Sequence, residues 1–228
     1  MNPISIILLL SLLMKTDTSS YPVNHTDQPI SISGQGDDPG WATATILTDF
    51  INPWSPDPVP PTQFQALWDD QYFYFLYQVE DRNIIAPGDP NDKRGVLPSD
   101  RVEIFFKANG EMDPYYCLEM DPRGRVLDYI ARFYRQVDFD WEWPEDALVV
   151  KASQTENQYV VEGRITLKSL REMGILSGSQ MEAGLFRGDY FPVKGKENQV
   201  HWISWIQPES QKPDFHLPSA FGFLNLIR

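Results

Sequence analysis

The sequence predicts an all-β protein, an antiparallel β-sandwich of the jelly-roll or immunoglobulin-like type with one or two short helices. Many short stretches of the 228-residue chain are rich in aromatic and β-branched residues, which favour strands. Gly, Pro, Asn and Asp residues separate these stretches at short intervals, as in sandwiches. The hairpin at residues 65–81 is largely apolar on both faces of its second run, which is typical of a central strand covered on each side.

Ahead of the hairpin, the sequence predicts several short segments and an irregular, proline-rich loop at residues 52–61. Residues 21–29 are interpreted as an N-terminal tail, and a single folded domain is expected over residues 30–228. Alternation predicts a short strand at residues 30–33. Asp38 followed by Pro39 is typical of the start of a helical turn.

The rest of the chain follows the same alternation of apolar runs and turn residues. A long loop rich in Pro, Gly and charge is expected at residues 82–99. A short amphipathic helix is expected at residues 167–173, ended by Gly174. Strands are expected at residues 100–107, 115–120, 126–134, 147–153, 158–166, 181–189, 201–206 and 222–227.

The charge balance limits the classes of partner. The chain has 19 Lys and Arg residues against 32 Asp and Glu residues, a formal net charge of −13. This argues against nucleic acid, whose phosphates are bound by clustered basic residues. No basic run suggests binding to an anionic membrane surface.

The apolar run at residues 4–14, followed by Thr18, Ser19 and Ser20, is typical of a secretory signal peptide. Residues 1–20 are therefore expected to be removed. The mature protein is then expected to be secreted or periplasmic and not bound to a membrane. An uncleaved anchor is the alternative. The single cysteine, Cys117, lies in a strand pattern and is interpreted as a small buried hydrophobic residue.

Catalytic motifs give little signal. The chain has three histidines and no nucleophile elbow or zinc-protease motif. Its many carboxylates leave a glycoside hydrolase mechanism open, since that needs only two of them across a sugar. Haem ligation by His201 or His216 with a methionine is a further alternative. One structural calcium ion is expected, because acidic pairs such as Asp37-Asp38, Asp69-Asp70 and Glu80-Asp81 offer oxygen ligands in loops, although no ligand set is assigned.

Aromatic residues in or beside loops and late strands suggest a sugar-binding surface. The candidates are Trp141, Trp143, Trp202, Trp205 and Phe215. Aromatic faces stack on sugar rings, while carboxylates and amides bind the hydroxyls. For each tryptophan taken alone, burial in the core is the competing interpretation.

An ordered series of motifs resembles carbohydrate-binding module family 9 and its relatives in the DOMON-like group. The motifs are Ile32-Ser33-Gly34-Gln35-Gly36-Asp37-Asp38-Pro39-Gly40-Trp41, Ala66-Leu67-Trp68-Asp69-Asp70-Gln71-Tyr72-Phe73-Tyr74, Asp100-Arg101-Val102-Glu103-Ile104-Phe105-Phe106, Tyr159-Val160-Val161-Glu162-Gly163-Arg164-Ile165-Thr166-Leu167-Lys168-Ser169-Leu170, Trp205, and Phe215-His216-Leu217-Pro218-Ser219-Ala220-Phe221-Gly222. Together they extend from about residue 30 to the C-terminus.

The resemblance implies a β-sandwich, often stabilised by calcium, that grips the end of a glycan between two tryptophans. It assigns Glu103 to the sugar hydroxyls, relates Arg187 to an arginine common in one subgroup, and places Trp205 beside the site. The two platform positions fall on Leu97 and Phe215, so the pair of tryptophans is missing. We expect Phe215 to stack on the sugar, and we hypothesise that Trp141 or Trp143 replaces the other platform.

The predicted function is that of a secreted, non-catalytic protein that binds a plant-type polysaccharide or the end of an oligosaccharide. Xylan or cellulose is the expected ligand class, and a glycanase is the expected partner in polysaccharide degradation. Two alternatives remain open. One is an enzyme associated with glycoside hydrolysis through paired carboxylates. The other is a family scaffold that has lost sugar binding and binds a protein or haem.

Overall fold

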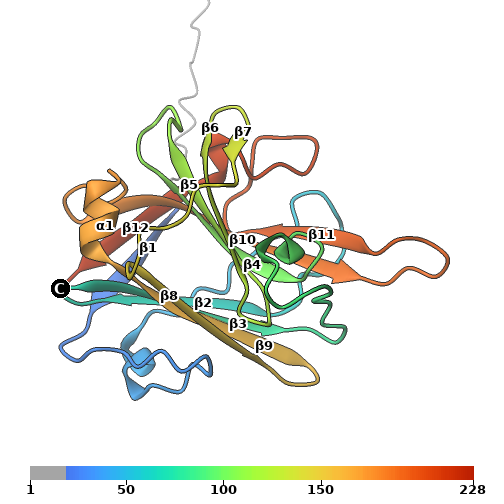
Figure 1. The fold of residues 1–228 in the computed structure, drawn as a ribbon, viewed down its shortest axis with the longest axis horizontal. Helices are drawn as coiled ribbons and strands as arrows, with labels where there is room; N and C mark the ends of the chain where they lie inside the picture. The colour runs from blue at the N-terminus through green and yellow to red at the C-terminus, as the bar shows by residue number, and fades with distance from the viewer. Residues whose placement is uncertain (1–18) are drawn as a thin grey trace, which may run out of the picture.

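The computed structural model describes residues 19–228, and almost all regular structure in this part of the chain is β (Figure 1). The strands are β1 (Ser20–His25), β2 (Thr62–Trp68), β3 (Tyr72–Glu80), β4 (Arg101–Lys107), β5 (Tyr115–Met120), β6 (Val126–Arg132), β7 (Gln136–Asp138), β8 (Leu148–Gln154), β9 (Gln158–Thr166), β10 (Gln180–Phe191), β11 (Gln199–Ser204) and β12 (Gly222–Ile227). The all-β prediction is confirmed. Apart from Ser19 and Ser20, the predicted signal peptide lies outside the described residues.

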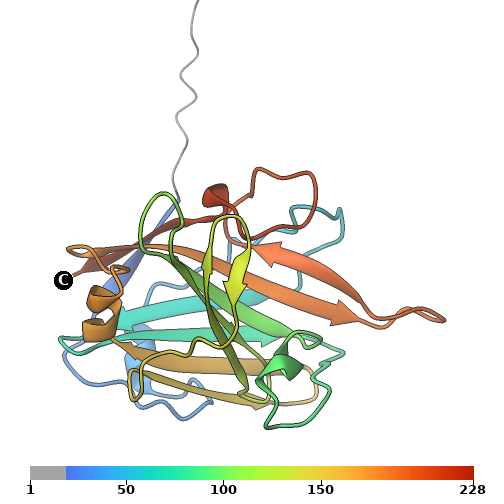
Figure 2. The same ribbon diagram turned by 45° about the horizontal axis from the view of Figure 1, so that its top comes forward.

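The strands form one continuous sheet rather than two separate ones. Its order is β7-β6-β5-β4-β10-β12-β1-β2-β3-β9-β8, with β11 paired to β10 outside this path. The sheet curls over, so its two halves face each other across the main core (Figures 1 and 2). Phe73 of β3 and Phe106 of β4 meet there, with ring centroids 6.4 Å apart. The pairing is antiparallel except at β1, which lies parallel to both β12 and β2.

The prediction of a tail at residues 21–29 is wrong, because β1 is an interior strand of the sheet. Tyr21 and Val23 point into the main core and are buried. Sequence alone gave a weak signal, since two apolar residues separated by Pro22 are unlike an ordinary strand. The partners that fix β1 lie far along the chain, around Trp68 and residues 223–227.

The prediction of a strand at residues 30–33 is also wrong. Two backbone N–H groups of this segment donate to carboxylates, so they are not available for pairing with another strand. Ser31 N donates to Asp38 Oδ2 at 2.8 Å, and Ser33 N donates to Glu162 Oε1 at 2.6 Å. Side chains of Ile30 and Ile32 nevertheless pack inward, over the outer face of β3. The segment is therefore a cover held by side chains.

The hairpin that the sequence singled out is confirmed as β2 and β3. Phe73, Phe75 and Tyr77 face the main core, while Tyr74 and Leu76 lie under the cover formed by residues 30–41. Both faces of β3 are thus buried, as its pattern predicted.

Both predicted helical segments are present. Asp38 caps the 3-10 helix η1 (Pro39–Thr43) by accepting from Gly40 N at 2.8 Å. Thr166 caps α1 (Leu167–Glu172), and Gly174 follows it with a φ of 73°. Two further 3-10 turns, η2 (Lys93–Val96) and η3 (Pro218–Ala220), were not predicted. Within residues 19–228 no helix has the length and apolar character needed to cross a membrane.

Candidate functional site

The register between β4 and β10 separates two of the predicted site residues. Glu103 is opposite Phe186, and Arg187 is opposite Val102. Because neighbouring residues of a strand point to opposite faces, Glu103 and Arg187 lie on opposite faces of the sheet. The resemblance suggested a common site for them, and the structure does not bring them together.

Glu103 is 1% exposed and belongs to a buried charge cluster with Arg101 and Glu119. Arg101 Nε donates to Glu103 Oε1 at 2.8 Å and lies 2.7 Å from Glu119 Oε2. The single hydrogen of Nε points at Glu103, so the contact with Glu119 is an ion pair without a hydrogen bond. Tyr129 holds the other oxygen of Glu119 by a 2.8 Å hydrogen bond.

Two carboxyl groups thus share one guanidinium. Burial, reinforced by the negative charge of Glu119, raises the pKa of Glu103 to about 8, although Arg101 acts in the opposite direction. Near neutral pH the Glu103 carboxyl therefore keeps its proton and can donate a hydrogen bond as well as accept one.

Trp202 of β11 covers this cluster. Its ring lies 5.1 Å from the Arg101 guanidinium, in cation–π geometry. Gly188 is the residue paired with Trp202, and a Cβ there would meet Arg101 Nη1 at 3.3 Å and the Trp202 ring at 3.4 Å. A glycine at this position leaves room for the arginine and the indole to approach each other.

A pocket of about 220 Å³ opens beside Trp202. Its lining residues are Glu103, Arg135, Trp202, Pro213, Asp214, Phe215 and His216. Phe215 stacks on Phe186, with centroids 4.0 Å apart and planes 9° apart, and meets Trp202 edge-on at 5.7 Å. Two of the predicted site residues, Glu103 and Phe215, therefore meet in one pocket.

Asp214 organises the polar side of the pocket. Its Oδ1 accepts from Arg135 Nη2 at 2.8 Å and from His216 N at 2.9 Å, and its Oδ2 accepts from the Tyr134 hydroxyl. His216 Nδ1 lies 2.9 Å from the Tyr115 hydroxyl. Burial lowers the pKa of His216 to about 4, so this ring is neutral at physiological pH. The exposed Arg135 is the cation that a ligand would meet.

Three predicted tryptophans lie elsewhere. Trp143 and Trp205 are each 7% exposed and belong to the main core, and Trp141 packs on Tyr116 at its edge. Tyr116 lies on one face of the sheet, whereas Glu119 and Glu103 lie on the other face. The hypothesis that Trp141 or Trp143 forms a platform is therefore wrong, because their rings complete the core.

Leu97 is 38% exposed and does not line the pocket. Its carbonyl accepts from Arg101 Nη1 at 2.9 Å and from the Tyr190 hydroxyl at 2.8 Å, so its backbone supports the cluster under Trp202. Trp202 is one of the aromatic candidates in the sequence, but the resemblance points to Trp205. Strand alternation distinguishes them, because Trp202 adjoins the buried Ile203 and so faces outward. Arg135 and Asp214 gave no local signal, since they converge only in the fold.

Comparisons with known proteins bear on this geometry. The family model described as carbohydrate family 9 binding domain-like matches residues 32–228. The chain belongs to this family. Endo-1,4-beta-xylanase A of Thermotoga maritima is 25% identical to this family 9 domain over 198 residues, which are 86% of the chain but only 17% of the xylanase.

Solved structures share the fold of this family 9 domain. A putative carbohydrate-binding protein from Bacteroides uniformis is 18% identical, with a TM-score of 0.67 over 91% of this chain and 99% of that one. A carbohydrate-binding module family 9 from Caldicellulosiruptor kristjanssonii in complex with glucose is 18% identical, with a TM-score of 0.56 over 92% and 96%. Its complex with cellotriose is 15% identical, with a TM-score of 0.56 over 91% and 93%.

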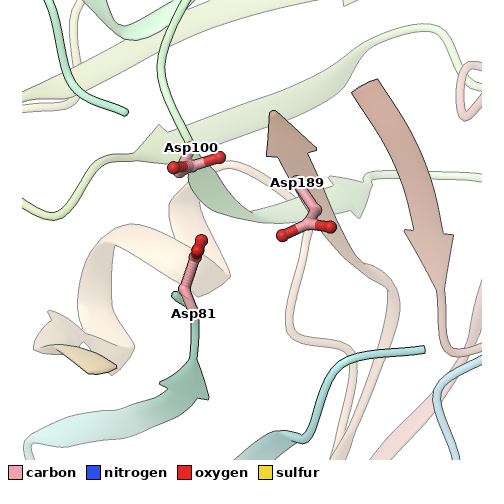
Figure 3. A group of neighbouring side chains, drawn as sticks. All are labelled: Asp81, Asp100 and Asp189. Carbon is pink, nitrogen blue, oxygen red and sulfur yellow. The ribbon is translucent and has the colours of Figure 1, made fainter. Parts of the chain in front are cut away.

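On the opposite face of β10, the family 9 domain holds a cluster of three aspartates, Asp81, Asp100 and Asp189. Their carboxylates point toward one another, each offering an oxygen within 4.8 Å of the others (Figure 3). Among residues 19–228 this is the place where acidic or histidine ligands converge closely enough for a metal ion. The fully buried Arg187 reaches into this cluster.

A larger pocket, of about 750 Å³, adjoins the aspartate cluster. Prolines 58, 60 and 61 form one wall, and Tyr190, Phe191 and His201 line another part. Both ring nitrogens of His201 are engaged, Nδ1 with Asp189 at 3.2 Å and Nε2 with Asp57 at 3.1 Å. In this arrangement neither nitrogen is free to ligate haem iron.

Proposed function

We propose that this protein is a secreted, non-catalytic carbohydrate-binding protein whose ligand site is the pocket between Trp202, Phe215 and Glu103. One observation carries the proposal: a partly buried indole lines a small pocket that is also lined by a carboxyl, a carboxylate and an exposed guanidinium. The indole offers an apolar face to the C–H groups of a sugar ring. Arg135 donates to its hydroxyls, and Asp214 Oδ2, which accepts one hydrogen bond from Tyr134, accepts a second from the sugar.

The size of the pocket favours one sugar unit at the end of a chain. At about 220 Å³ it is smaller than the roughly 300–1,000 Å³ of drug-sized ligand sites. The ligand is then the end of a plant-type polysaccharide or oligosaccharide, with cellulose and xylan as first candidates. Support comes from a structural relative that was solved in complex with cellotriose, and from a sequence relative that is named as a xylanase. A glycanase is the proposed partner in polysaccharide degradation.

The hydrogen bonds that the carboxyl groups of the pocket already make favour sugar binding over sugar hydrolysis. A glycosidase uses one carboxyl as an acid and a second as nucleophile or base. Both oxygens of Asp214 already accept hydrogen bonds, and Glu103 is held beneath Arg101. Secretion rests on the signal-peptide pattern of residues 1–20.

The proposal predicts that Trp202→Ala weakens sugar binding at least about tenfold, which corresponds to roughly 1.4 kcal/mol of lost stacking. The measurement is isothermal titration calorimetry of the mature protein with cello- and xylo-oligosaccharides. Trp141→Ala is the matched control, because Trp141 is a partly buried indole on the other face. It should keep wild-type affinity.

Three outcomes would overturn the proposal. Equal loss in both variants would place the sugar elsewhere. A uniformly negative glycan array with the wild-type protein would favour the alternative of a scaffold that binds a protein. A Soret band in the purified protein would favour haem.

A further inference from the structure

A buried arginine pairs with two of the three aspartates. Arg187 Nη2 is 2.6 Å from Asp189 Oδ1 and 3.3 Å from Asp81 Oδ2, and Arg187 is 0% exposed. The resemblance to family 9 modules implies a structural calcium ion, and this cluster is where such an ion would be sought. Whether calcium fits depends on what the carboxylates already bind.

Every carboxylate oxygen of the cluster already has a partner within the chain. The contacts are Asn83 N to Asp81 Oδ1, Arg187 Nη2 to Asp81 Oδ2, Tyr190 N to Asp100 Oδ1, Ile85 N to Asp100 Oδ2, Arg187 Nη2 to Asp189 Oδ1, and His201 Nδ1 beside Asp189 Oδ2. Calcium takes about six to eight oxygen ligands at about 2.3–2.6 Å. An ion between Asp81 and Asp189 would occupy the space of Arg187 Nη2.

Further contacts hold the guanidinium in this position. Its Nη1 donates to Thr62 Oγ1 at 3.0 Å and its Nη2 to the Glu80 carbonyl at 3.2 Å, while the Tyr159 ring lies 5.9 Å from it. The arginine therefore ties β10 to the start of β2 and the end of β3. A buried guanidinium needs paired carboxylates, and Asp81 and Asp189 supply them.

We propose that Arg187 is the built-in counter-cation of the Asp81–Asp100–Asp189 cluster, that it takes the place of a calcium ion there, and that the fold is stable without calcium. The donor set does not fit a bound ion as long as the arginine is present. Removing the guanidinium would leave three converging carboxylates, which is a site suited to a hard divalent cation.

The first test uses the wild-type chain. Its melting temperature should be the same within about 1 °C after dialysis against EDTA and in millimolar CaCl₂, with MgCl₂ as the ionic-strength control. A rise with CaCl₂ that MgCl₂ does not reproduce, or a fall after EDTA treatment, would overturn the proposal. This test needs no variant and no sugar, so its outcome is separate from that of the proposed function.

The second test is Arg187→Gln. This variant should melt lower than wild type in EDTA and regain about 5 °C or more in CaCl₂. Arg125→Gln is the matched control, since Arg125 is also buried but faces one carboxylate, Asp121, in a separate contact. It should be destabilised without any calcium response. An Arg187→Gln variant that folds but shows no calcium response, or equal responses in the two variants, would overturn the proposal. If Arg187→Gln does not fold in EDTA, refolding it in CaCl₂ gives the same decision.

Discussion

At the residue scale, the group that decides the character of the pocket floor is the triad of Arg101, Glu103 and Glu119. A single buried guanidinium between two carboxyls leaves the triad one positive charge short. Glu103 keeps its proton near neutral pH, because burial raises its pKa to about 8. The carboxyl at the floor of the pocket is therefore mostly protonated near pH 7.

This proton predicts a fall in stability between pH 6.5 and pH 8. Glu103 and Asp100 both have pKa values raised to about 8, mainly by burial, so the folded state holds protons that the unfolded chain releases. Stability then decreases as pH rises through this window, by on the order of 1 kcal/mol per group. Below pH 6.5 His216 acts in the opposite sense, because its pKa is lowered to about 4 and only the unfolded chain gains its proton.

Urea unfolding at pH 6.5 and pH 8 measures the effect. Glu103→Gln should reduce the dependence by about half and leave the part due to Asp100, since glutamine keeps a hydrogen-bonding side chain that does not titrate. Glu156→Gln, at an exposed position, is the control and should leave the slope as in wild type. Stability that rises between the two pH values would contradict the raised pKa values.

At the element scale, the cover formed by residues 30–41 depends on one carboxylate of β9. Glu162 is fully buried, and its Oε1 accepts from Ser33 N and Gly34 N, while its Oε2 accepts from Trp41 Nε1 at 3.3 Å. The cover has no strand pairing of its own. Its attachment is instead a set of charge-assisted hydrogen bonds, which are stronger than neutral ones.

Glu162→Ala should therefore loosen the cover and cost about 2–4 kcal/mol, because several buried donors lose their acceptor. Hydrogen exchange should become faster in residues 30–44 and stay unchanged in β4 and β5. Glu172→Ala, an exposed change on α1, is the control for a lost glutamate. Uniform acceleration across the whole sheet would show that Glu162 supports the global fold rather than this cover.

At the scale of the whole molecule, β1 joins the two halves of the curled sheet. It pairs with β12 through residues 20–24 and with β2 through Asn24 and His25. Tyr21 adds a cross-link, since its hydroxyl accepts from Ala66 N at 2.9 Å. The strand between the halves thus lies where the sequence pattern predicts a tail.

Removing this strand should destabilise the whole molecule. A chain that begins at Gln28 loses the buried side chains of Tyr21 and Val23, worth about 1.5–3 kcal/mol each, out of a total stability of roughly 5–15 kcal/mol. Its melting temperature should drop sharply compared with a chain that begins at Tyr21, the form expected after signal cleavage. Similar melting temperatures for the two chains would show that the halves hold together without β1.

The predictability of the molecule from its sequence follows the range of the interactions. Alternation and turn residues placed β2, β3, β5, β9 and β12, because their patterns are local. They failed at β1, which is fixed by partners nearly the whole chain away, and at residues 30–33, where carboxylates compete for the backbone. Glu103 and Phe215 were found by resemblance and meet in the pocket. Arg135 and Asp214 were missed, because loops distant in sequence bring them together.

The register of the last strand also determines how the molecule can be attached to a support. β12 runs antiparallel to β10, with Asn225 beside Gln180, so the chain end labelled in Figure 1 lies at the far end of β10 from Gly188 and Trp202. A resin, fluorophore or electrode coupled behind Arg228 would leave the pocket facing the bulk solution. Coupling ahead of Ser20, which pairs with Phe223, would bring the support nearer to it. Orientation on a sensor surface thus follows from which terminus carries the linker.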